Sequence, residues 1–155
     1  LQEADLKGAD LESADLYRAD LFKANLEDVD LQDANLDQPD LRKAILVKAD
    51  MRGANLFRAR MQGADLSEAD LYRADLEKSD LRDANLYKVD LRESNLHGVN
   101  LQGANLQGAD LEGANLFEAD LTEANLEGLS LERTNLESAK FLKTIMPDGH
   151  SHTRQ

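Results

Sequence analysis

The segment "LQGANLQGADLEGANLFEAD" (residues 101–120) contains four copies of a five-residue unit, A-[DN]-L-x-x, that runs through nearly the whole chain. We count the unit from its leucine, position i, so that Ala lies at i−2 and Asp or Asn at i−1. Every fifth residue from Leu1 to Met146 gives 30 central positions, of which 26 are Leu, three are Met and one is Phe141. Position i−2 is Ala in 20 of 29 repeats, and position i−1 is Asp or Asn in 24 of 29. No insertion interrupts this register.

A period of five fits neither an α-helix nor a continuous strand. On a helix, five residues turn through about 500°, so successive leucines would point in all directions. On a strand, an odd period would turn every second leucine towards water. The chain must therefore turn once per repeat, with i−2 and i facing inward, i−1 facing outward, and i+1 and i+2 forming a corner. Eight of the nine glycines lie at i+2, where a type II turn requires a positive φ.

The repeat of residues 1–146 resembles the pentapeptide repeat family. The resemblance implies an all-β fold, a right-handed quadrilateral parallel β-helix with four repeats per coil. The 30 repeats would then form about seven coils, and at about 4.8 Å per coil the solenoid would be roughly 35 Å long. Leu or Met at i and Ala at i−2 would fill its interior. The resemblance also implies a bacterial-type, non-enzymatic protein.

The repeat predicts one domain, residues 1–146, followed over residues 147–155 by a turn at Pro147-Asp148-Gly149 and a disordered tail. We expect residues 141–146 to form a last half-coil that plugs the leucine column, as similar endings do in some family members. The first coil has no comparable cover. Because an open sheet edge favours pairing, we predict end-to-end self-association through that N-terminal coil.

The composition excludes several kinds of partner and chemistry. A net charge of −13 argues against direct contact with nucleic acid or an anionic membrane. No apolar run is long enough to cross a bilayer, so we expect no membrane insertion. The absence of cysteine excludes thiolate metal and redox sites. With no signal-like segment, the expected location is cytoplasmic.

Four repeats per coil would stack outward side chains into columns. Unit charges about 4.8 Å apart repel by roughly 1 kcal/mol even in water, so stacked Asp must be offset by turn N–H donors, bases or counterions. Stacked Asn amides can instead hydrogen-bond to one another. One column, the Asp column, is Asp in six successive coils: Asp10, Asp30, Asp50, Asp70, Asp90 and Asp110.

Residues 41–60, which would form coil 3, are exceptional. They carry a net charge of +5, between −5 for residues 21–40 and −4 for residues 61–80. Ile45, Val47 and Phe57 add outward apolar side chains. We call the six bases of coil 3 the basic belt: Arg42, Lys43, Lys48, Arg52, Arg58 and Arg60. The belt has two interpretations, as a clasp that neutralises the acidic coils beside it or as a protein-contact site. The candidate contact residues are Arg42, Lys43, Ile45, Val47, Arg52, Phe57, Arg58 and Arg60.

Two functions fit this pattern best. The first is a non-catalytic scaffold that binds an unidentified protein, with aromatics at i+1 as anchors: Tyr17, Phe22, Phe57, Tyr72, Tyr87 and Phe117. The alternative is an acidic mimic of DNA that binds a type II topoisomerase such as gyrase, as some family members do. The basic belt, Leu rather than Phe at i, and the lack of a long C-terminal helix depart from those members. A further alternative is a repeat segment within a longer chain.

Enzymatic activity is not expected. The three histidines are His97, His150 and His152, and the last two have no evident third ligand with which to hold a metal. A convex solenoid offers no cleft that would desolvate a carboxylate and raise its pKa. We therefore predict no catalytic, cofactor-binding or metal-binding residues, and no cofactor.

Overall fold

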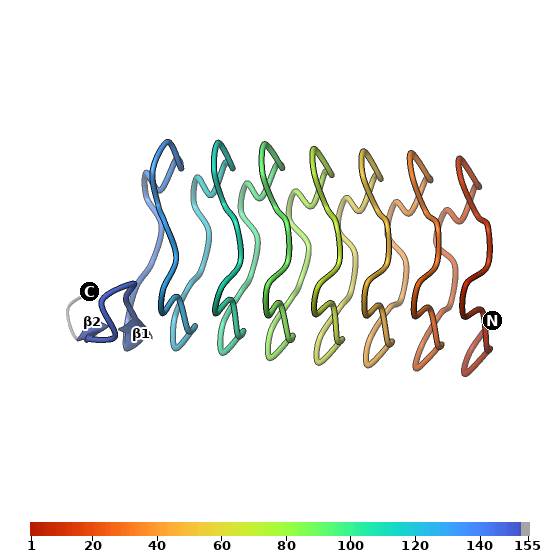
Figure 1. The fold of residues 1–155 in the computed structure, drawn as a ribbon, viewed down its shortest axis with the longest axis horizontal. Coiled ribbons are helices and arrows are strands. Elements are labelled where there is room, and N and C mark those ends of the chain that lie inside the picture. Colours follow the sequence, from red (N-terminus) through yellow and green to blue (C-terminus); the bar gives the residue numbers. More distant parts are fainter. Residues whose placement is uncertain (153–155) are drawn as a thin grey trace.

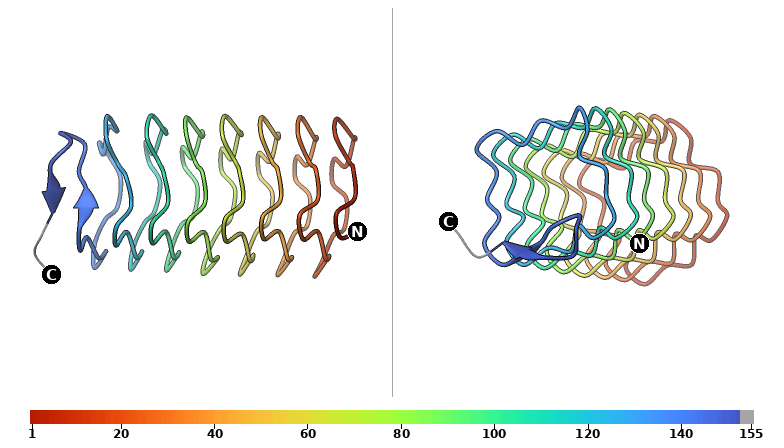
Figure 2. Two further views of the ribbon diagram at one scale, coloured as in Figure 1. Left: turned by 90° about the horizontal axis from the view of Figure 1, so that it is seen from below. Right: turned by 60° about the vertical axis from the view of Figure 1, so that its left-hand side comes forward.

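The computed structural model describes residues 1–152, which form a rod of stacked coils (Figure 1). Parallel β-bridges join every outward residue at i−1 except Asp110 to its counterpart four repeats later, from Asp5 with Asn25 to Asn125 with Ile145. One coil is therefore four repeats, as the family resemblance implies. We number the coils in blocks of four repeats, so that coil 1 is residues 1–20 and coil 3 is residues 41–60. The oblique view on the right of Figure 2 shows the coils stacked one behind another.

Regular strands are short because each repeat pairs only one residue per wall. The described residues contain two strands of two residues each, β1 (Thr144–Ile145) and β2 (Ser151–His152), paired antiparallel. Elsewhere the walls consist of single bridged residues at i−1. Among residues 1–152, no helix is long and apolar enough to cross a membrane.

Backbone hydrogen bonds satisfy four of the five N–H groups of a typical repeat. In the repeat of Leu71, the N–H at i donates to the carbonyl of Asp90 in the next coil (2.8 Å), and the N–H at i+2 donates to the carbonyl of Arg92 (3.0 Å). The N–H of Asp70, at i−1, donates to the carbonyl of Ala49 in the preceding coil (2.9 Å). The N–H of Ala74 closes the corner on the carbonyl of Leu71 (3.0 Å).

The fifth N–H, at i+1, depends on the side chain at i−1. The N–H of Tyr72 donates to Asp70 Oδ1 at 3.0 Å. The same contact, an Asx turn, occurs at all 24 Asp and Asn residues of this position. The preference for Asp or Asn at i−1 is therefore a backbone requirement, because no backbone acceptor reaches this N–H.

The corners require the left-handed conformation at i+2. Every residue at i+2 from Glu3 to Lys143 has a positive φ, and most of these residues are not glycine. A non-glycine residue in this region costs roughly 1–2 kcal/mol. Glycine therefore concentrates at the corners for the predicted reason, that it adopts a positive φ without strain. At the other corners, the backbone hydrogen bonds and the buried core must offset the strain.

The interior is a dry stack of leucine, methionine and alanine. Leu at i and Ala at i−2 are almost fully buried from Leu21 to Leu126, and each buried leucine stabilises the fold by about 1.5–3 kcal/mol. Ser79 and Ser94 replace Ala at i−2, and their hydroxyls donate to carbonyls of the same corner at 2.7 and 2.6 Å. The buried polar groups at these positions are thus satisfied.

Stacked Asn side chains form hydrogen-bonded ladders, as predicted. In each contact the amide Nδ2 donates to the side-chain oxygen of the equivalent residue one coil earlier. The wall that contains Asn95 shows this contact in two runs, each starting at an aspartate. Asp15 accepts from Asn35, which accepts from Asn55; Asp75 accepts from Asn95, and the run continues through Asn115 and Asn135.

The C-terminal end differs in part from the sequence-based expectation. Residues 141–146 continue the coil, as predicted, through the bridge of Asn125 with Ile145, but these six residues make about a third of a turn rather than the expected half-coil. The chain then turns at Gly149, and β2 folds back on β1 (Figures 1 and 2). Ser151–His152 is therefore a strand rather than the expected disordered tail, and the remainder of that tail, residues 153–155, lies outside the described residues. Leu131 and Leu136 stay only partly buried, so the plug is incomplete.

The first coil is less covered than the interior coils. Leu1 is 61% exposed, and Leu6, Leu11 and Leu16 are partly buried. In coil 2 the leucines at the same positions are fully buried. End-to-end self-association through coil 1 stays a prediction.

One wall opens between coils 6 and 7. The N–H groups of Gly108, Leu111 and Gly113 lack the ladder bonds that their counterparts make in coils 1 to 5, and Ser130 has no bridge to Asp110. The residue at i−2 beside this opening is Leu129, where most repeats have Ala. Val29 and Val89 occupy the same column and keep an intact ladder. We infer that the larger leucine holds coil 7 away from coil 6.

Leu129→Ala is expected to close this wall. Hydrogen exchange at the amides of Leu111 and Gly113 should slow by about tenfold or more, because each regains an acceptor in the ladder. Exchange measured by NMR provides the test. Val89→Ala is the matched control, since its wall is already paired, and it should leave exchange at Asp110 and Leu111 unchanged. Unaltered exchange at both amides in Leu129→Ala would refute the explanation.

Candidate functional site

Three of the six belt bases are bound within the rod. Arg42 holds Asp40 through two parallel hydrogen bonds, Nε to Oδ1 at 2.8 Å and Nη2 to Oδ2 at 2.6 Å. Arg60 Nη1 contacts the same carboxylate from coil 3 at 3.1 Å. The hydrogen-bonded Arg42 guanidinium lowers the pKa of Asp40 below its ordinary value. Arg42 therefore holds Asp40 locally, within the same turn, and Arg60 links coil 3 to Asp40 of coil 2.

Arginines also offset the repulsion in the Asp column. Arg52 Nη2 lies 2.5 Å from Asp50 and its Nε lies 3.7 Å from Asp70 in the next coil. Arg92 repeats this arrangement at 2.5 Å from Asp90 and 3.7 Å from Asp110. Each arginine hydrogen-bonds to the aspartate of its own coil and lowers the pKa of that aspartate. The clasp interpretation thus holds for Arg42, Arg52 and Arg60.

The other three belt bases, Lys43, Lys48 and Arg58, make no ion pair with any part of the chain that the structure describes. Lys43 and Lys48 stand at the two corners that flank the wall of Ile45, which is 44% exposed. Val47, partly buried, lies next to Lys48. Of the predicted contact residues, the structure therefore brings Lys43, Ile45 and Val47 together on one wall, with Lys48 beside them.

The predicted aromatic anchors are covered in a way that the sequence analysis missed. In five of the six cases the aromatic at i+1 is followed by Arg or Lys at i+2, which stacks over the ring; Arg58 lies 5.0 Å from the centroid of Phe57. The sixth, Phe117, packs against His97 at 5.4 Å. An aromatic residue followed directly by Arg or Lys recurs in the sequence, and this pattern could have predicted the stacking. These rings form cation–π corners rather than bare apolar anchors.

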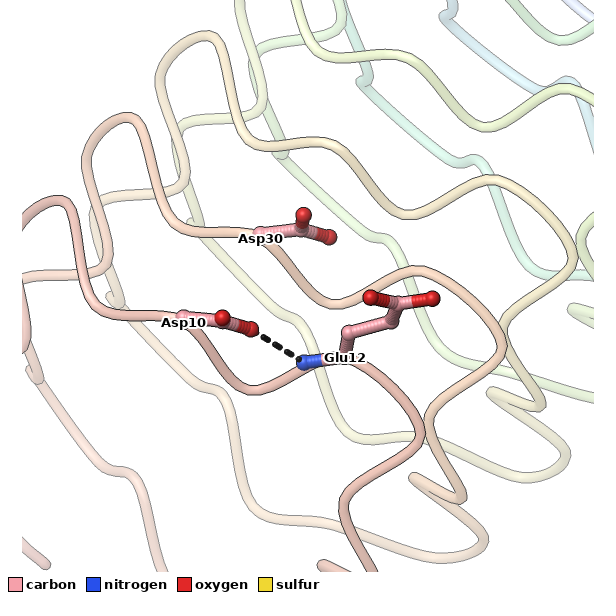
Figure 3. Close-up of side chains that lie close together, drawn as sticks. All are labelled: Asp10, Glu12 and Asp30. Atoms are coloured by element: carbon pink, nitrogen blue, oxygen red, sulfur yellow. Dashed lines mark hydrogen bonds between the residues drawn. The ribbon is translucent and has the colours of Figure 1, made fainter.

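The N-terminal end of the Asp column has no arginine clasp within the described residues. One carboxylate oxygen from each of Asp10, Glu12 and Asp30 lies within 4.8 Å of the others (Figure 3). Asp10 Oδ1 accepts the N–H of Glu12 at 3.2 Å, the same Asx turn as elsewhere. Exposed carboxylates of this kind line the rod, and proximity alone does not distinguish a metal site, so we assign none here.

The histidines do not converge on one site. His97 lies between two carboxylates, with Nδ1 3.7 Å from Glu77 and Nε2 3.6 Å from Glu118. His150 lies 3.4 Å from Asp148, and His152 packs on Phe141 with their ring centroids 6.0 Å apart. These contacts pair each histidine with its own neighbours.

The repeat matches a known family model along its length. The model, described as pentapeptide repeats, matches residues 1–38, 40–71, 59–98, 69–108, 79–117, 94–128 and 114–147. Only Pro39 falls between matched segments, and it is the one repeat position where proline replaces Ala and removes the corner N–H. A search of curated protein sequences gave no match.

Solved structures of the same type are similar to this chain. HetL, a pentapeptide repeat protein involved in heterocyst differentiation regulation in the cyanobacterium Nostoc, is 39% identical over 98% of this chain and 76% of its own, with a TM-score of 0.36. A pentapeptide repeat protein of the Arabidopsis thaliana thylakoid lumen is 31% identical over 63% of this chain and 68% of its own, with a TM-score of 0.62. QnrB1, a plasmid-mediated fluoroquinolone resistance protein, is 22% identical over 89% and 77%, with a TM-score of 0.58, and shows similarity of fold alone.

Breaking the Asp40 clasp is expected to destabilise the protein in a pH-dependent way. Arg42→Gln should lower the free energy of unfolding slightly at neutral pH, because the pair is exposed and screened by solvent. Because the folded pKa of Asp40 is depressed, the clasp contributes fully above the ordinary carboxyl pKa and is lost as the pH falls through the folded value. Urea unfolding of both proteins from pH 7 to pH 2.5 should show the difference shrinking below about pH 4.

Lys43→Gln is the control for this experiment, because it removes a belt charge that has no ion pair among residues 1–152. It should have little effect on stability at either pH. A deficit in Arg42→Gln that persists unchanged at pH 2.5 would mean that the guanidinium acts through packing rather than through Asp40.

Proposed function

Because the chain belongs to the pentapeptide repeat family, whose members fold as right-handed quadrilateral β-helices and are generally non-catalytic, we propose that it is a scaffold that binds another protein. The contact surface is the wall of Lys43, Ile45, Val47 and Lys48, which we call the coil-3 wall. The observation that carries the proposal is Ile45, a 44% exposed isoleucine between two lysines in a rod of net charge −13.

Ile45 is unfavourable for the rod itself. It cannot accept the N–H of Val47, which has no hydrogen-bond acceptor among the described residues. Asn at this position would restore that bond and extend the amide ladder from Asn25. A residue that gives up a corner hydrogen bond and exposes apolar surface is favoured when a partner covers it. Three of the four arginines of the belt, Arg42, Arg52 and Arg60, form ion pairs within the rod instead.

The remaining features of the proposal follow from the same geometry. The two hollows described on the surface, of about 340 and 410 Å³, are open and lined mainly by charged side chains, whereas catalytic pockets are enclosed and largely apolar. The rod therefore acts by presenting a rigid wall. A cytoplasmic location and a bacterial-type role belong to this proposal.

Ile45→Asn separates the two roles of this position. It should raise the free energy of unfolding by about 1 kcal/mol, because the Val47 N–H gains an acceptor. It should also abolish capture of the partner from the native extract, as measured by affinity purification and mass spectrometry, because the apolar centre of the contact is lost. Reversing Lys43 and Lys48 to Glu should also abolish capture.

The matched control reverses Lys88 and Lys143 to Glu, which changes the net charge equally in the same two corner columns but in other coils. It should leave the captured proteins unchanged. If Ile45→Asn is more stable and still captures the same proteins as the native chain, the coil-3 wall is not the contact surface.

A second candidate function is the acidic DNA mimic that binds gyrase. The observation that favours it is the unbroken Asp column in coils 1 to 6, linked by parallel bridges. Against it, Arg52 and Arg92 neutralise part of this column. If the chain is such a mimic, micromolar protein should inhibit gyrase supercoiling, and reversal of the unclasped pair Asp10 and Asp30 to Lys should remove inhibition. The clasped column predicts no inhibition, and full inhibition would favour the mimic over the scaffold.

A further inference from the structure

Two arginines stand apart from all others in the part of the chain that the structure describes. Residues 1–152 contain nine arginines. Arg18 and Arg58 make no ion pair in this part of the chain, whereas seven lie within 4.0 Å of a carboxylate oxygen. The seven are Arg42, Arg52, Arg60, Arg73, Arg82, Arg92 and Arg133. In a chain with 31 acidic residues, unpaired arginines are unusual.

Arg18 and Arg58 share one corner of the rod. They occupy the same column, with Gln38 between them in coil 2. Each is fixed by stacking on the aromatic ring before it, Arg18 at 5.8 Å from the centroid of Tyr17 and Arg58 at 5.0 Å from that of Phe57. Stacking on the ring face leaves the guanidinium edge free to donate hydrogen bonds. The two donors are therefore partly preorganised on one side of the molecule.

Both arginines line one open hollow of about 410 Å³, which we call the arginine hollow. Its other lining residues are Asp20, Gln38, Asp40 and Arg60. Arg42 and Arg60 both hold the carboxylate of Asp40, so this acid is already neutralised. Asp20 accepts the side-chain amide of Gln2 at 2.5 Å and the N–H of Phe22 at 3.3 Å but has no basic partner in the described chain. The donors of Arg18 and Arg58 thus exceed the acceptors inside the hollow.

We propose that the arginine hollow binds an acidic segment of another protein, with one carboxylate on Arg18 and a second on Arg58. Two coils separate the arginines, which corresponds to about 10 Å. Two acidic residues three apart in a polyproline II segment span nearly the same distance, about 9 Å, and point to the same side. Each arginine would bind a carboxylate through parallel hydrogen bonds, and the Gln38 amide is available between them. This site lies on a different wall from Ile45 and does not depend on the coil-3 wall.

A short acidic segment fits this site better than a long polyanion. Beyond the hollow, the nearby bases are held in ion pairs, Lys78 of coil 4 with Glu77 and Arg82 of coil 5 with Asp80. The same corner reaches Glu118 in coil 6, and the rod as a whole has a net charge of −13. A nucleic acid extending beyond the hollow would meet these acids and be repelled. A segment with two carboxylates ends before it reaches them.

Side-chain NMR tests the proposal directly. The probe is a capped peptide, Gly-Glu-Gly-Gly-Glu-Gly, added to the ¹⁵N-labelled chain at low ionic strength. We expect saturable shifts of the Arg18 and Arg58 Nε–H signals and of the Gln38 amide, with the paired Arg82 and Arg92 as internal references that stay in place. The same peptide with Gln in place of Glu should cause no shift.

Variants then assign the binding energy. The double change Arg18→Gln and Arg58→Gln should weaken binding of the Glu peptide by about tenfold, as expected for two exposed ion pairs. Asp20→Asn should strengthen binding, because it removes the unpaired acid. Lys88→Gln is the matched control, since Lys88 has no ion pair within residues 1–152 and stacks on Tyr87 at 5.2 Å, and it should change binding by less than about twofold.

Three results would overturn the proposal. The first is equal shifts with the Gln peptide, and the second is unchanged affinity in the double variant. The third is a short DNA duplex that shifts Arg18 and Arg58 at lower concentration than the Glu peptide, which would assign the hollow to nucleic acid.

Discussion

The hydrogen bond from the N–H at i+1 to the side chain at i−1 is the interaction on which the rest of the rod depends. The backbone supplies acceptors for the other four N–H groups of a repeat, but none reaches this one. Asp and Asn fill the need in every repeat that contains them, and the solenoid can then turn once per repeat without a buried unpaired donor. Nearly half of the acidity is a by-product of this requirement, since 14 of the 31 acidic residues are Asp at i−1, where Asp serves the corner as well as Asn does.

That by-product creates the electrostatic problem that the arginines solve. On the outside of the rod, Arg52 bridges Asp50 and Asp70 of neighbouring coils, Arg60 links coil 3 to Asp40 of coil 2, and Arg42 holds the same Asp40 locally. The basic belt therefore has two parts. Arg42, Arg52 and Arg60 form ion pairs with aspartates of the rod. The other three bases, Lys43, Lys48 and Arg58, have no ion pair within the described chain, and Lys43 and Lys48 flank the exposed Ile45.

The sequence predicted the features that follow from the period, and missed those that follow from side-chain geometry. The corner at i+2, the inward Leu and Ala, and the Asn ladders all recur with every repeat or every coil, so a count reveals them. The choice between clasp and contact site at Arg42 or Arg58 depends on which carboxylate a long side chain reaches, and spacing does not specify that. The opening at Leu129 depends on one methylene group, because valine in the same column is accommodated. The strand at Ser151–His152 lies outside the repeat, where no period was available.

The Asn ladders also give the rod a direction. Because a carboxylate accepts but cannot donate, Asp is placed at the N-terminal start of a run and Asn continues it. In the wall of Asn95 the runs start at Asp15 and Asp75, and in the opposite wall of Asn85 they start at Asp5 and Asp65. In both walls the amides donate towards the N-terminal end of the rod. A coil that carries Asn on both walls, such as coil 5 with Asn85 and Asn95, can therefore be lost or duplicated while the next amide keeps an acceptor, so rods of this kind can change length by single coils.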